Sequence, residues 1–219
     1  LKANMVAVSI YAVIVATSEK WCGRAVKTTS ALPIGDIFSD LTFRERYNDL
    51  LSRTGRDVLT GLYDRTRMEL EAPIMIRETL REGQSATVMI LDADHFKNVN
   101  DVFGHLQGDD VLRAISARLG SILRAGDRVF RFGGEEFVVV MPDTDATVAE
   151  KVAERIRAEI AQLPFAIGQE GKTIEVTVSV GVSSVLNGAD TVAALMKRAD
   201  VALYEAKSGG RNRVVAKAA

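Results

Sequence analysis

Two aspartates follow a strongly apolar segment, and their spacing allows metal chemistry. Asp92 and Asp94 come directly after the run Val88-Met-Ile-Leu91. Side chains two residues apart on a strand point to the same side, so both carboxylates could approach a hard divalent ion such as Mg²⁺. The alternative is that Asp94 only caps a following helix while Asp92 is solvated, and an isolated Asp-x-Asp pattern favours that alternative.

A second acidic pair follows two glycines. Glu135 and Glu136 come directly after Gly133-Gly134, a dipeptide that favours a two-residue hairpin turn. Glycine leaves the backbone open to a phosphate group. Adjacent strand residues point to opposite faces, so only one of the two glutamates can share a face with the core. Solvated acids would explain this hairpin alone, but acidic ends on two separate apolar strands favour a shared site.

Composition limits the classes of partner. The 219 residues are 47% hydrophobic, which is enough for the core of one domain with a shorter attachment. With 28 Lys and Arg against 29 Asp and Glu, no net field attracts nucleic acid or an anionic membrane. A bound phosphate must therefore be held locally. The single cysteine, Cys22, cannot form an internal disulfide, which fits a reducing cytosol.

The first 56 residues read as an attachment to the main domain. Pro and Gly within 30–35 mark a boundary, so 1–36 is predicted to be an N-terminal segment left from an upstream sensor region. Its apolar stretch 5–16 is shorter than the roughly 20 residues of a membrane-spanning helix. We interpret it as an element of an upstream domain, with a membrane-helix stub or vector sequence as alternatives. A linker helix is predicted over 37–56, and its apolar stripe could pair with a second copy or pack on its own domain; the stripe comprises Phe43, Tyr47, Leu50, Leu51 and Thr54.

From Asp57 onward the predicted elements alternate. We expect helices over 73–82, 111–123, about 148–160 and 191–207, and strands over 87–93, 129–132, 135–141, 174–182 and 213–215. Pro73 is expected in the first turn of its helix, where a missing N–H costs nothing. Strict alternation predicts one core face for the strand 174–182. The order predicts an α+β fold, a ferredoxin-like or palm-type βαββαβ sandwich with added helices.

Several motifs together resemble one known family. Gly133-Gly-Glu-Glu-Phe137 is similar to the signature of the GGDEF family of diguanylate cyclases, in its Glu-containing variant, and the resemblance runs from Asp57 to about Val215. The matching blocks are Asp57-Val-Leu-Thr-Gly-Leu62, 92–101, Phe103-Gly-His105, Gly108-Asp109 and 207–212. Departures are few: Asp64 stands where the family often has Asn, and Ala93 is smaller than usual. The resemblance implies a palm-type cyclase domain over 57–219 that condenses two GTP into cyclic di-3′,5′-GMP and two pyrophosphates.

The resemblance also implies site residues. Metal binding, to Mg²⁺ or alternatively Mn²⁺, would fall to Asp92, the backbone carbonyl of Ala93 and Glu135, with Glu136 close by. It gives catalytic roles to Lys97, Glu135 and Glu136, without separating which glutamate acts as base. Asn100 and Asp109 would read guanine, because an amide and a carboxylate complement its edge. His105 would lie near the base or ribose, or only pack the loop, and phosphate contacts would come from Lys97, Lys207 and Arg211.

A regulatory site and a dimer follow from the same resemblance. Arg124-Ala-Gly-Asp127, nine residues before Gly133, matches an inhibitory product site, and Arg155 matches its auxiliary arginine. Because each domain would hold one GTP, the reaction needs a homodimer. The competing hypothesis is a catalytically silent module that binds GTP or cyclic di-GMP, against which the three carboxylates Asp92, Glu135 and Glu136 argue. A cytoplasmic catalytic domain is expected, with a membrane tether in the full-length protein left open.

Overall fold

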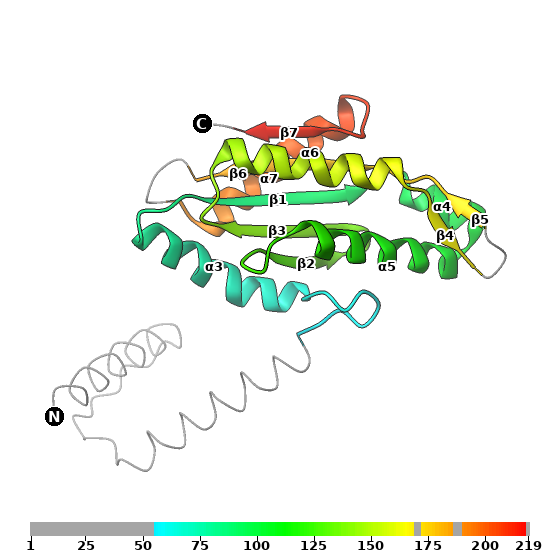
Figure 1. Ribbon diagram of the computed structural model, residues 1–219, viewed down its shortest axis with the longest axis horizontal. Helices are drawn as coiled ribbons and strands as arrows, with labels where there is room; N and C mark the ends of the chain where they lie inside the picture. Colours follow the sequence, from blue (N-terminus) through cyan, green and yellow to red (C-terminus); the bar gives the residue numbers. More distant parts are fainter. Residues whose placement is uncertain (1–54, 169–171, 186–189, 218–219) are drawn as a thin grey trace, which may run out of the picture. The chain divides into compact units, whose positions relative to one another are not determined.

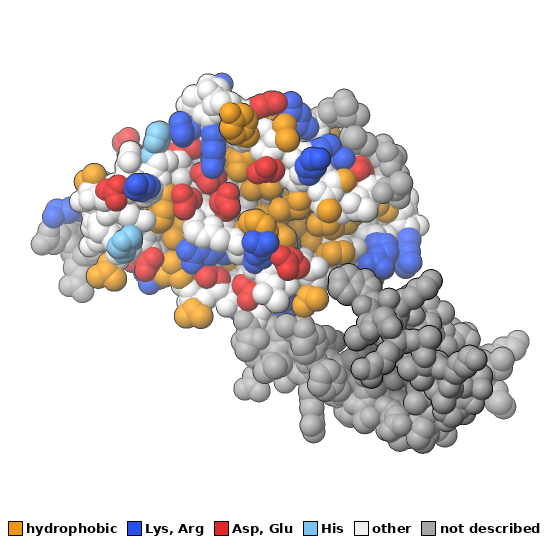
Figure 2. All heavy atoms as spheres, turned by 180° about the vertical axis from the view of Figure 1, so that it is seen from behind, with side chains coloured by type: hydrophobic (Ala, Val, Ile, Leu, Met, Phe, Trp, Pro, Cys, Tyr) orange, Lys and Arg blue, Asp and Glu red, His pale blue; other side chains and the backbone are white. Residues whose placement is uncertain are grey.

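The computed structural model describes residues 55–168, 172–185 and 190–217 (Figure 1). The predictions for 1–36, for Cys22 and for the linker helix up to residue 54 lie outside these ranges. Within them, no helix combines the length and the apolar character that a membrane span requires. On the face shown in Figure 2, acidic and basic side chains are interspersed, in keeping with the nearly neutral net charge.

A five-stranded sheet lies at the centre of the domain. Its strands are β1 (Ala86–Ala93), β2 (Arg128–Gly133), β3 (Glu136–Pro142), β6 (Val178–Ser184) and β7 (Val214–Lys217). They lie in the order β2-β3-β1-β6-β7, with β6 and β7 parallel and the other neighbours antiparallel. The first four reproduce the ferredoxin-like βαββαβ order, and β7 extends the edge. The predicted α+β class is confirmed.

Helices cover both faces of this sheet, as Figure 1 shows. The helices α3 (Arg65–Arg81) and α7 (Val192–Ser208) pack on one face, and α5 (His105–Ile122) and α6 (Ala146–Gln162) pack on the other. The sequence did not predict the short helix α4 (Phe96–Phe103) or the separate two-stranded sheet of β4 (Phe165–Ile167) and β5 (Lys172–Ile174).

The central strand β1 is buried on both faces and divides the core in two. Met89 and Leu91 belong to the cluster under α5 and α6, whereas Val88 and Ile90 belong to the cluster under α3 and α7. Side chains alternate along a strand, so one apolar run can serve both layers. The strand therefore holds its end, at Asp92, in a fixed place between the layers.

The predicted single strand over 174–182 was wrong in extent, although its alternating apolar face lies in the core as predicted. Ile174 ends β5 in the small sheet, and a new strand, β6, begins at Val178 in the main sheet. All seven residues of β6 are buried, because α7 covers the face that carries its small residues. A Cβ at Gly181 would lie 2.1 Å from the carbonyl oxygen of Ala199, so only glycine admits α7 this closely.

The helix around Pro73 was also predicted wrongly. It begins at Arg65, capped by Asp64, whose side chain accepts a 2.8 Å hydrogen bond from the amide of Arg67. Pro73 therefore lies inside α3 rather than in its first turn, and the helix loses one backbone hydrogen bond there. Burial of the stripe Met68, Ala72 and Ile76 continues through the proline and offsets that loss.

Two other helices differ in detail from the prediction. The helix α5 begins at His105 rather than 111, and it buries Leu112, Ile115 and Leu119. The helix α6 buries Ala149 and Ala153, together with Ile156 and Ile160, while Val148 is exposed.

Candidate active site

The carboxylates of Asp92 and Glu136 lie on two central, adjacent strands. In the register of β1 and β3, Asp92 is directly opposite Glu136, so both side chains leave the same face of the sheet. Lys207 near the end of α7 reaches Asp92 with a 2.7 Å contact between its Nζ and Oδ2. Three residues from distant parts of the sequence thus form one charged group.

Burial dominates the electrostatics of this pair. Burial raises the pKa of Asp92 above its ordinary value, and the hydrogen bond and charge of Lys207 offset only part of the rise. Burial, followed by the charge of Asp92, raises the pKa of Glu136. Without a cation, the ionised form of both side chains is therefore disfavoured. A bound divalent ion would offset the free-energy cost of ionising them.

The donor set fits Mg²⁺ bound together with a substrate. In the part of the chain that the structure describes, no group of three or more His, Cys, Asp or Glu side chains is arranged to hold a metal alone. Mg²⁺ sites on nucleotides commonly use one or two carboxylates and complete their shell with phosphate oxygens and water. Asp92 and Glu136 supply that number of carboxylates.

The hairpin turn separates the two glutamates. The pair Gly133↔Glu136 closes the hairpin, so the turn consists of Gly134 and Glu135. Glu135 therefore precedes β3, whereas the sequence predicted that the strand would begin there. Gly134 has φ +49°, a conformation that side-chain-bearing residues rarely adopt. As a result, Glu136 faces Asp92 across the sheet and Glu135 lines a pocket.

That pocket, of about 450 Å³, lies between α4, the start of α5 and the hairpin. Five residues predicted for substrate or catalysis line it together, namely Lys97, Asn100, His105, Asp109 and Glu135. Phe96 and Leu112 contribute apolar surface. The pocket thus joins a carboxylate, an amide and a cation to apolar walls, which are groups that can bind a polar base and a phosphate.

Gly108 makes room for the amide that lines this pocket. A Cβ on Gly108 would lie 2.0 Å from Oδ1 of Asn100 and 3.1 Å from the ring of Phe96. The side chain of Asn100 therefore packs against the backbone of α5, where only glycine fits. Gly108 immediately precedes Asp109, so the predicted guanine readers Asn100 on α4 and Asp109 on α5 both line the pocket.

The loop between α7 and β7 holds Arg211, which does not line the pocket. Its backbone has φ +61° and donates a 3.0 Å hydrogen bond to the carbonyl of Ala206. Four residues earlier, Lys207 contacts Asp92. The structure therefore brings Lys207 to the carboxylate pair and Arg211 into the loop that follows.

Asp94, the second carboxylate of the Asp-x-Asp pattern, has different partners from Asp92. It is buried, and its carboxylate accepts hydrogen bonds from the hydroxyls of Thr177 and Ser179, each at 2.6 Å, and from the amide of Asn212 at 3.0 Å. It does not cap a helix, because His95 is the N-cap of α4 and makes no side-chain capping bond. The helix cap considered for Asp94 was therefore wrong.

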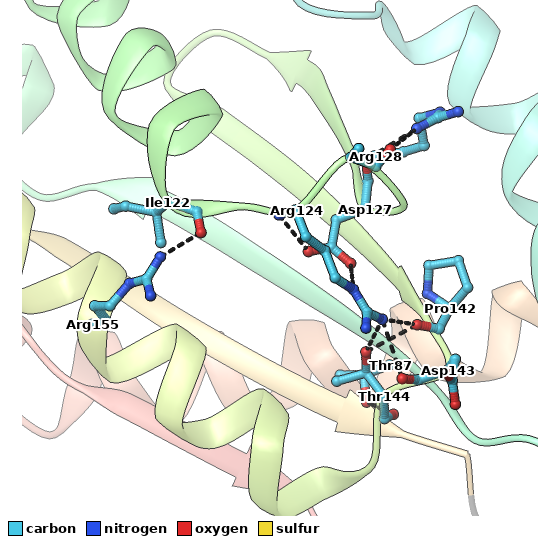
Figure 3. A network of polar contacts seen from close by, with 10 residues as sticks. Thr87, Ile122, Arg124, Asp127, Arg128, Pro142, Asp143, Thr144 and Arg155 are labelled. Atoms are coloured by element: carbon cyan, nitrogen blue, oxygen red, sulfur yellow. Dashed lines mark hydrogen bonds and ion pairs between the residues drawn. The ribbon is translucent and has the colours of Figure 1, made fainter.

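The residues predicted to bind product lie around the start of β2 (Figure 3). Nε of Arg124 donates to Asp127 at 3.1 Å, and its Nη2 donates to the hydroxyl of Thr144 at 2.8 Å and to the carbonyls of Pro142 and Asp143. Arg155 on α6 donates to the carbonyl of Ile122. Each arginine is thus bonded to backbone, and Asp127 is buried beside Arg124.

Comparison with known proteins decides the family. The family model described as "Diguanylate cyclase, GGDEF domain" matches residues 54–213. This chain belongs to the GGDEF family. The GGDEF match includes the hairpin, the pocket and the loop after α7.

Curated relatives and solved structures agree with this GGDEF assignment. The response regulator PleD of Caulobacter vibrioides is 42% identical over 184 residues, and the diguanylate cyclase DgcM of Escherichia coli is 38% identical over 182 residues. These matches take in 80% and 82% of this chain but only 40% and 43% of the relatives, so the chain spans about two fifths of their length.

Two GGDEF structures illustrate the similarity of fold. The coiled coil and GGDEF domain of DgcB from Caulobacter crescentus, solved in complex with c-di-GMP, aligns with a TM-score of 0.73 at 30% identity, covering 84% of this chain and 97% of that one. The active GGEEF domain of a diguanylate cyclase from Vibrio cholerae aligns with a TM-score of 0.66 at 32% identity, covering 71% and 97%.

Sequence reasoning missed the residues that anchor the GGDEF hairpin. Arg131 on β2 donates to the carbonyl of Gly134 from both Nε and Nη2, at 3.0 and 2.8 Å, and its Nη1 forms a bidentate contact with Asp57 at 2.9 and 3.0 Å. Burial would raise the pKa of Asp57, but hydrogen bonds from Thr60 and Arg131 outweigh it and hold that pKa below its ordinary value. The only sequence signal was that Asp57 opens the first matching block.

Proposed function

We propose that this chain is a diguanylate cyclase that condenses two GTP molecules into cyclic di-3′,5′-GMP and two pyrophosphates. In each of two steps, a 3′-hydroxyl attacks the α-phosphorus of the other nucleotide, a phosphorus–oxygen bond forms, and pyrophosphate leaves. The hydroxyl proton passes to a base. Because each domain would hold one GTP, the reaction requires two subunits that face each other.

One observation carries this proposal: a carboxylate pair, the buried Asp92 and the half-buried Glu136, lies at the sheet end beside a pocket that Asn100, Asp109 and Glu135 line. Asp92, Glu135 and Glu136, with the backbone carbonyl of Ala93, would hold Mg²⁺, or Mn²⁺ in its place. The bound metal would neutralise phosphate charge and lower the pKa of the attacking hydroxyl.

The remaining site residues would bind two parts of the nucleotide, the guanine base and the phosphates. Asn100 and Asp109 would bind the guanine edge, since an amide offers a donor and an acceptor and a carboxylate accepts from N1 and N2. His105 at the pocket wall would contact the base or ribose. Lys97, Lys207 and Arg211 would stabilise the charge that develops as pyrophosphate leaves. Lys207 would then exchange Asp92 for a phosphate oxygen.

Product inhibition is the second part of the proposal. Cyclic di-GMP would bind at Arg124, Asp127 and Arg155, because an arginine can contact both the Hoogsteen edge of guanine and a phosphate. This requires Arg124 to leave its present carbonyl partners. The variant Arg124→Ala should relieve inhibition by added product, and unchanged inhibition would remove these residues from the regulatory account.

A direct assay tests the activity. Purified protein is incubated with GTP and Mg²⁺ at high protein concentration, and the products are separated by chromatography. We expect cyclic di-GMP and pyrophosphate in a 1:2 ratio, the stoichiometry of the proposed condensation, and loss of turnover in Glu135→Gln and Glu136→Gln. Absence of product from a folded dimer that binds GTP would favour the silent binding module instead. The relatives are longer, so an upstream sensor region and a cytoplasmic site of action also remain proposals.

A further inference from the structure

The loop after α7 has a backbone that needs external support. Three consecutive residues, Gly210, Arg211 and Asn212, have φ of +113°, +61° and +43°. For residues with a side chain, each such conformation costs of order 1 kcal/mol or more and persists only where surrounding contacts enforce it. The contacts that enforce this one come from two other parts of the domain.

Asn212 is held at both its amide and its side chain. Its backbone N–H donates to Oδ2 of Asp94 at 3.0 Å, and its Oδ1 accepts a 2.7 Å hydrogen bond from Nη1 of Arg157. Asp94 follows the end of β1, and Arg157 lies on α6. The loop is therefore tied to the strand that carries Asp92 and to a helix on the opposite side of the core.

The Asp94 carboxylate has a structural set of partners. Oδ1 accepts from the hydroxyl of Ser179, and Oδ2 accepts from the hydroxyl of Thr177 and from Asn212. Its side chain is buried within these three donors. Such a carboxylate is directed toward protein hydrogen bonds rather than toward a cation beside Asp92.

Arg157 is in turn oriented by Glu154. Its Nε and Nη2 form hydrogen bonds to the Glu154 carboxylate at 2.5 to 2.9 Å, which leaves Nη1 directed at Asn212. A guanidinium fixed by a bidentate partner has little freedom left to lose when it binds a third group. The contact with Asn212 is thus well placed to restrain the loop.

We propose that Asp94, Asn212 and Arg157 form a loop clamp, a set of positioning residues that hold Arg211 ready for the triphosphate of the substrate. The inference rests on the proposed function and extends it to residues that touch neither base nor metal. The α7 end of the loop carries Lys207 at the carboxylate pair, so a loop fixed at Asn212 would keep the backbone of Arg211 within four residues of that lysine. Loss of the clamp should weaken phosphate binding and leave base binding intact.

Equilibrium binding separates these two effects. We would titrate the full chain with guanosine and with a GTP analogue that carries a non-cleavable bridge between its α- and β-phosphates, in the presence of Mg²⁺. For Arg157→Met we expect the affinity for the triphosphate to fall about tenfold, the order for one charge-assisted contact, with the guanosine affinity unchanged. Lys151→Met, an exposed position on the same helix, is the control and should change neither.

Two further variants test the geometry of the clamp. Asn212→Gly keeps the amide and tolerates the positive φ but loses the acceptor for Arg157, so it should reproduce the effect of Arg157→Met. The double variant should be no weaker than either single variant, because both remove the same bond. Additive losses would overturn the clamp, as would an equal loss of guanosine affinity.

The role of Asp94 is tested through the metal. In Asp94→Asn, which keeps the size of the side chain, we expect reduced affinity for the triphosphate analogue and an unchanged half-saturating Mg²⁺ concentration. A large rise in that concentration would show that Asp94 is a metal ligand and would refute its positioning role. These measurements need no turnover, so a wild-type chain that binds the analogue but makes no product would refute the cyclase proposal and leave the clamp standing.

Discussion

The candidate nucleotide pocket and the proposed product site differ in how they hold their charged side chains. In the pocket, Lys97, Asp109 and Glu135 line a hollow of about 450 Å³. Around Arg124, the guanidinium is bonded to Asp127 and to three successive residues of the β3–α6 turn, as Figure 3 shows. A ligand can enter the first region directly, whereas in the second it must compete with bonds that the protein already makes.

This difference has an energetic consequence. A ligand that must displace internal hydrogen bonds binds more weakly than one that enters a preformed site, by the free energy of the bonds it breaks. Product would then inhibit only after it accumulates, whereas the pocket would bind GTP at a lower ligand concentration. Four variants can test the contrast.

The largest effect is expected from the hairpin anchor. Arg131→Met removes the bonds to Asp57 and to the carbonyl of Gly134, so the turn that carries Glu135 loses its support. We expect kcat to fall by about tenfold to a hundredfold, since misplacing a catalytic group by 1 Å can cost that much. Steady-state kinetics measure it, with Arg113→Met, an exposed pair on α5, as the control. Equal losses in both variants would contradict the anchor.

Gly108→Ala should damage the pocket itself. Its Cβ would displace the side chain of Asn100, and an unsatisfied polar partner costs about 1–3 kcal/mol. We expect the KM for GTP to rise about tenfold or more. Gly120→Ala is a matched control, because Gly120 lies in the same helix and a Cβ there would meet nothing within 4 Å. A normal KM in Gly108→Ala would show that Asn100 does not read the nucleotide.

Thr144→Val should strengthen product inhibition. The change keeps the shape of the buried side chain but removes the hydroxyl that accepts from Arg124. With one internal bond fewer to break, Arg124 should bind product about two- to threefold more tightly, at the lower end of the worth of a hydrogen bond. Inhibition curves with added cyclic di-GMP measure this. Thr79→Val, where the hydroxyl bonds to the carbonyl of Met75 on α3, is the control and should not shift the curve.

The smallest effect concerns the stability of the metal-free protein. Because the pKa of Glu136 is raised on folding, its ionised form opposes folding at pH 7. Glu136→Gln should therefore raise Tm by about 1–2 °C at that pH, a small gain since solvent screens a half-buried carboxylate. As the pH falls through the raised pKa, the folded wild type takes up a proton and the difference should shrink. A lower Tm for the variant at pH 7 would contradict the assigned cause.

The sequence predicted the strands and the pocket residues better than the long-range contacts that hold them in place. Local apolar runs identified β1 and β3, and motif positions identified Asn100, Asp109 and Glu135, which the structure brings to one pocket. Each of these features depends on residues that are close together in the sequence. Fold class and family follow from them because pattern and motif agree.

What was not predicted depends on contacts between distant residues. Asp94 looked like a partner of Asp92, but the hydroxyls of Thr177 and Ser179, more than 80 positions away, determine its role. The same holds for Asp57 and Arg131, which are 74 positions apart. Pro73 was misplaced because burial across α3 overrides a local rule about proline. Spacing within one segment carries no information on such long-range pairs.

The position of Asp92 and Glu136 within the sheet limits how the domain can be switched. Both residues lie on strands with neighbours on either side, β1 between β3 and β6, and β3 between β2 and β1. Amide groups in such strands exchange with solvent only when much of the domain opens. We therefore expect the carboxylates to keep the same separation in resting and working states. An activating signal would then act by bringing two whole catalytic domains together, with the carboxylate geometry unchanged.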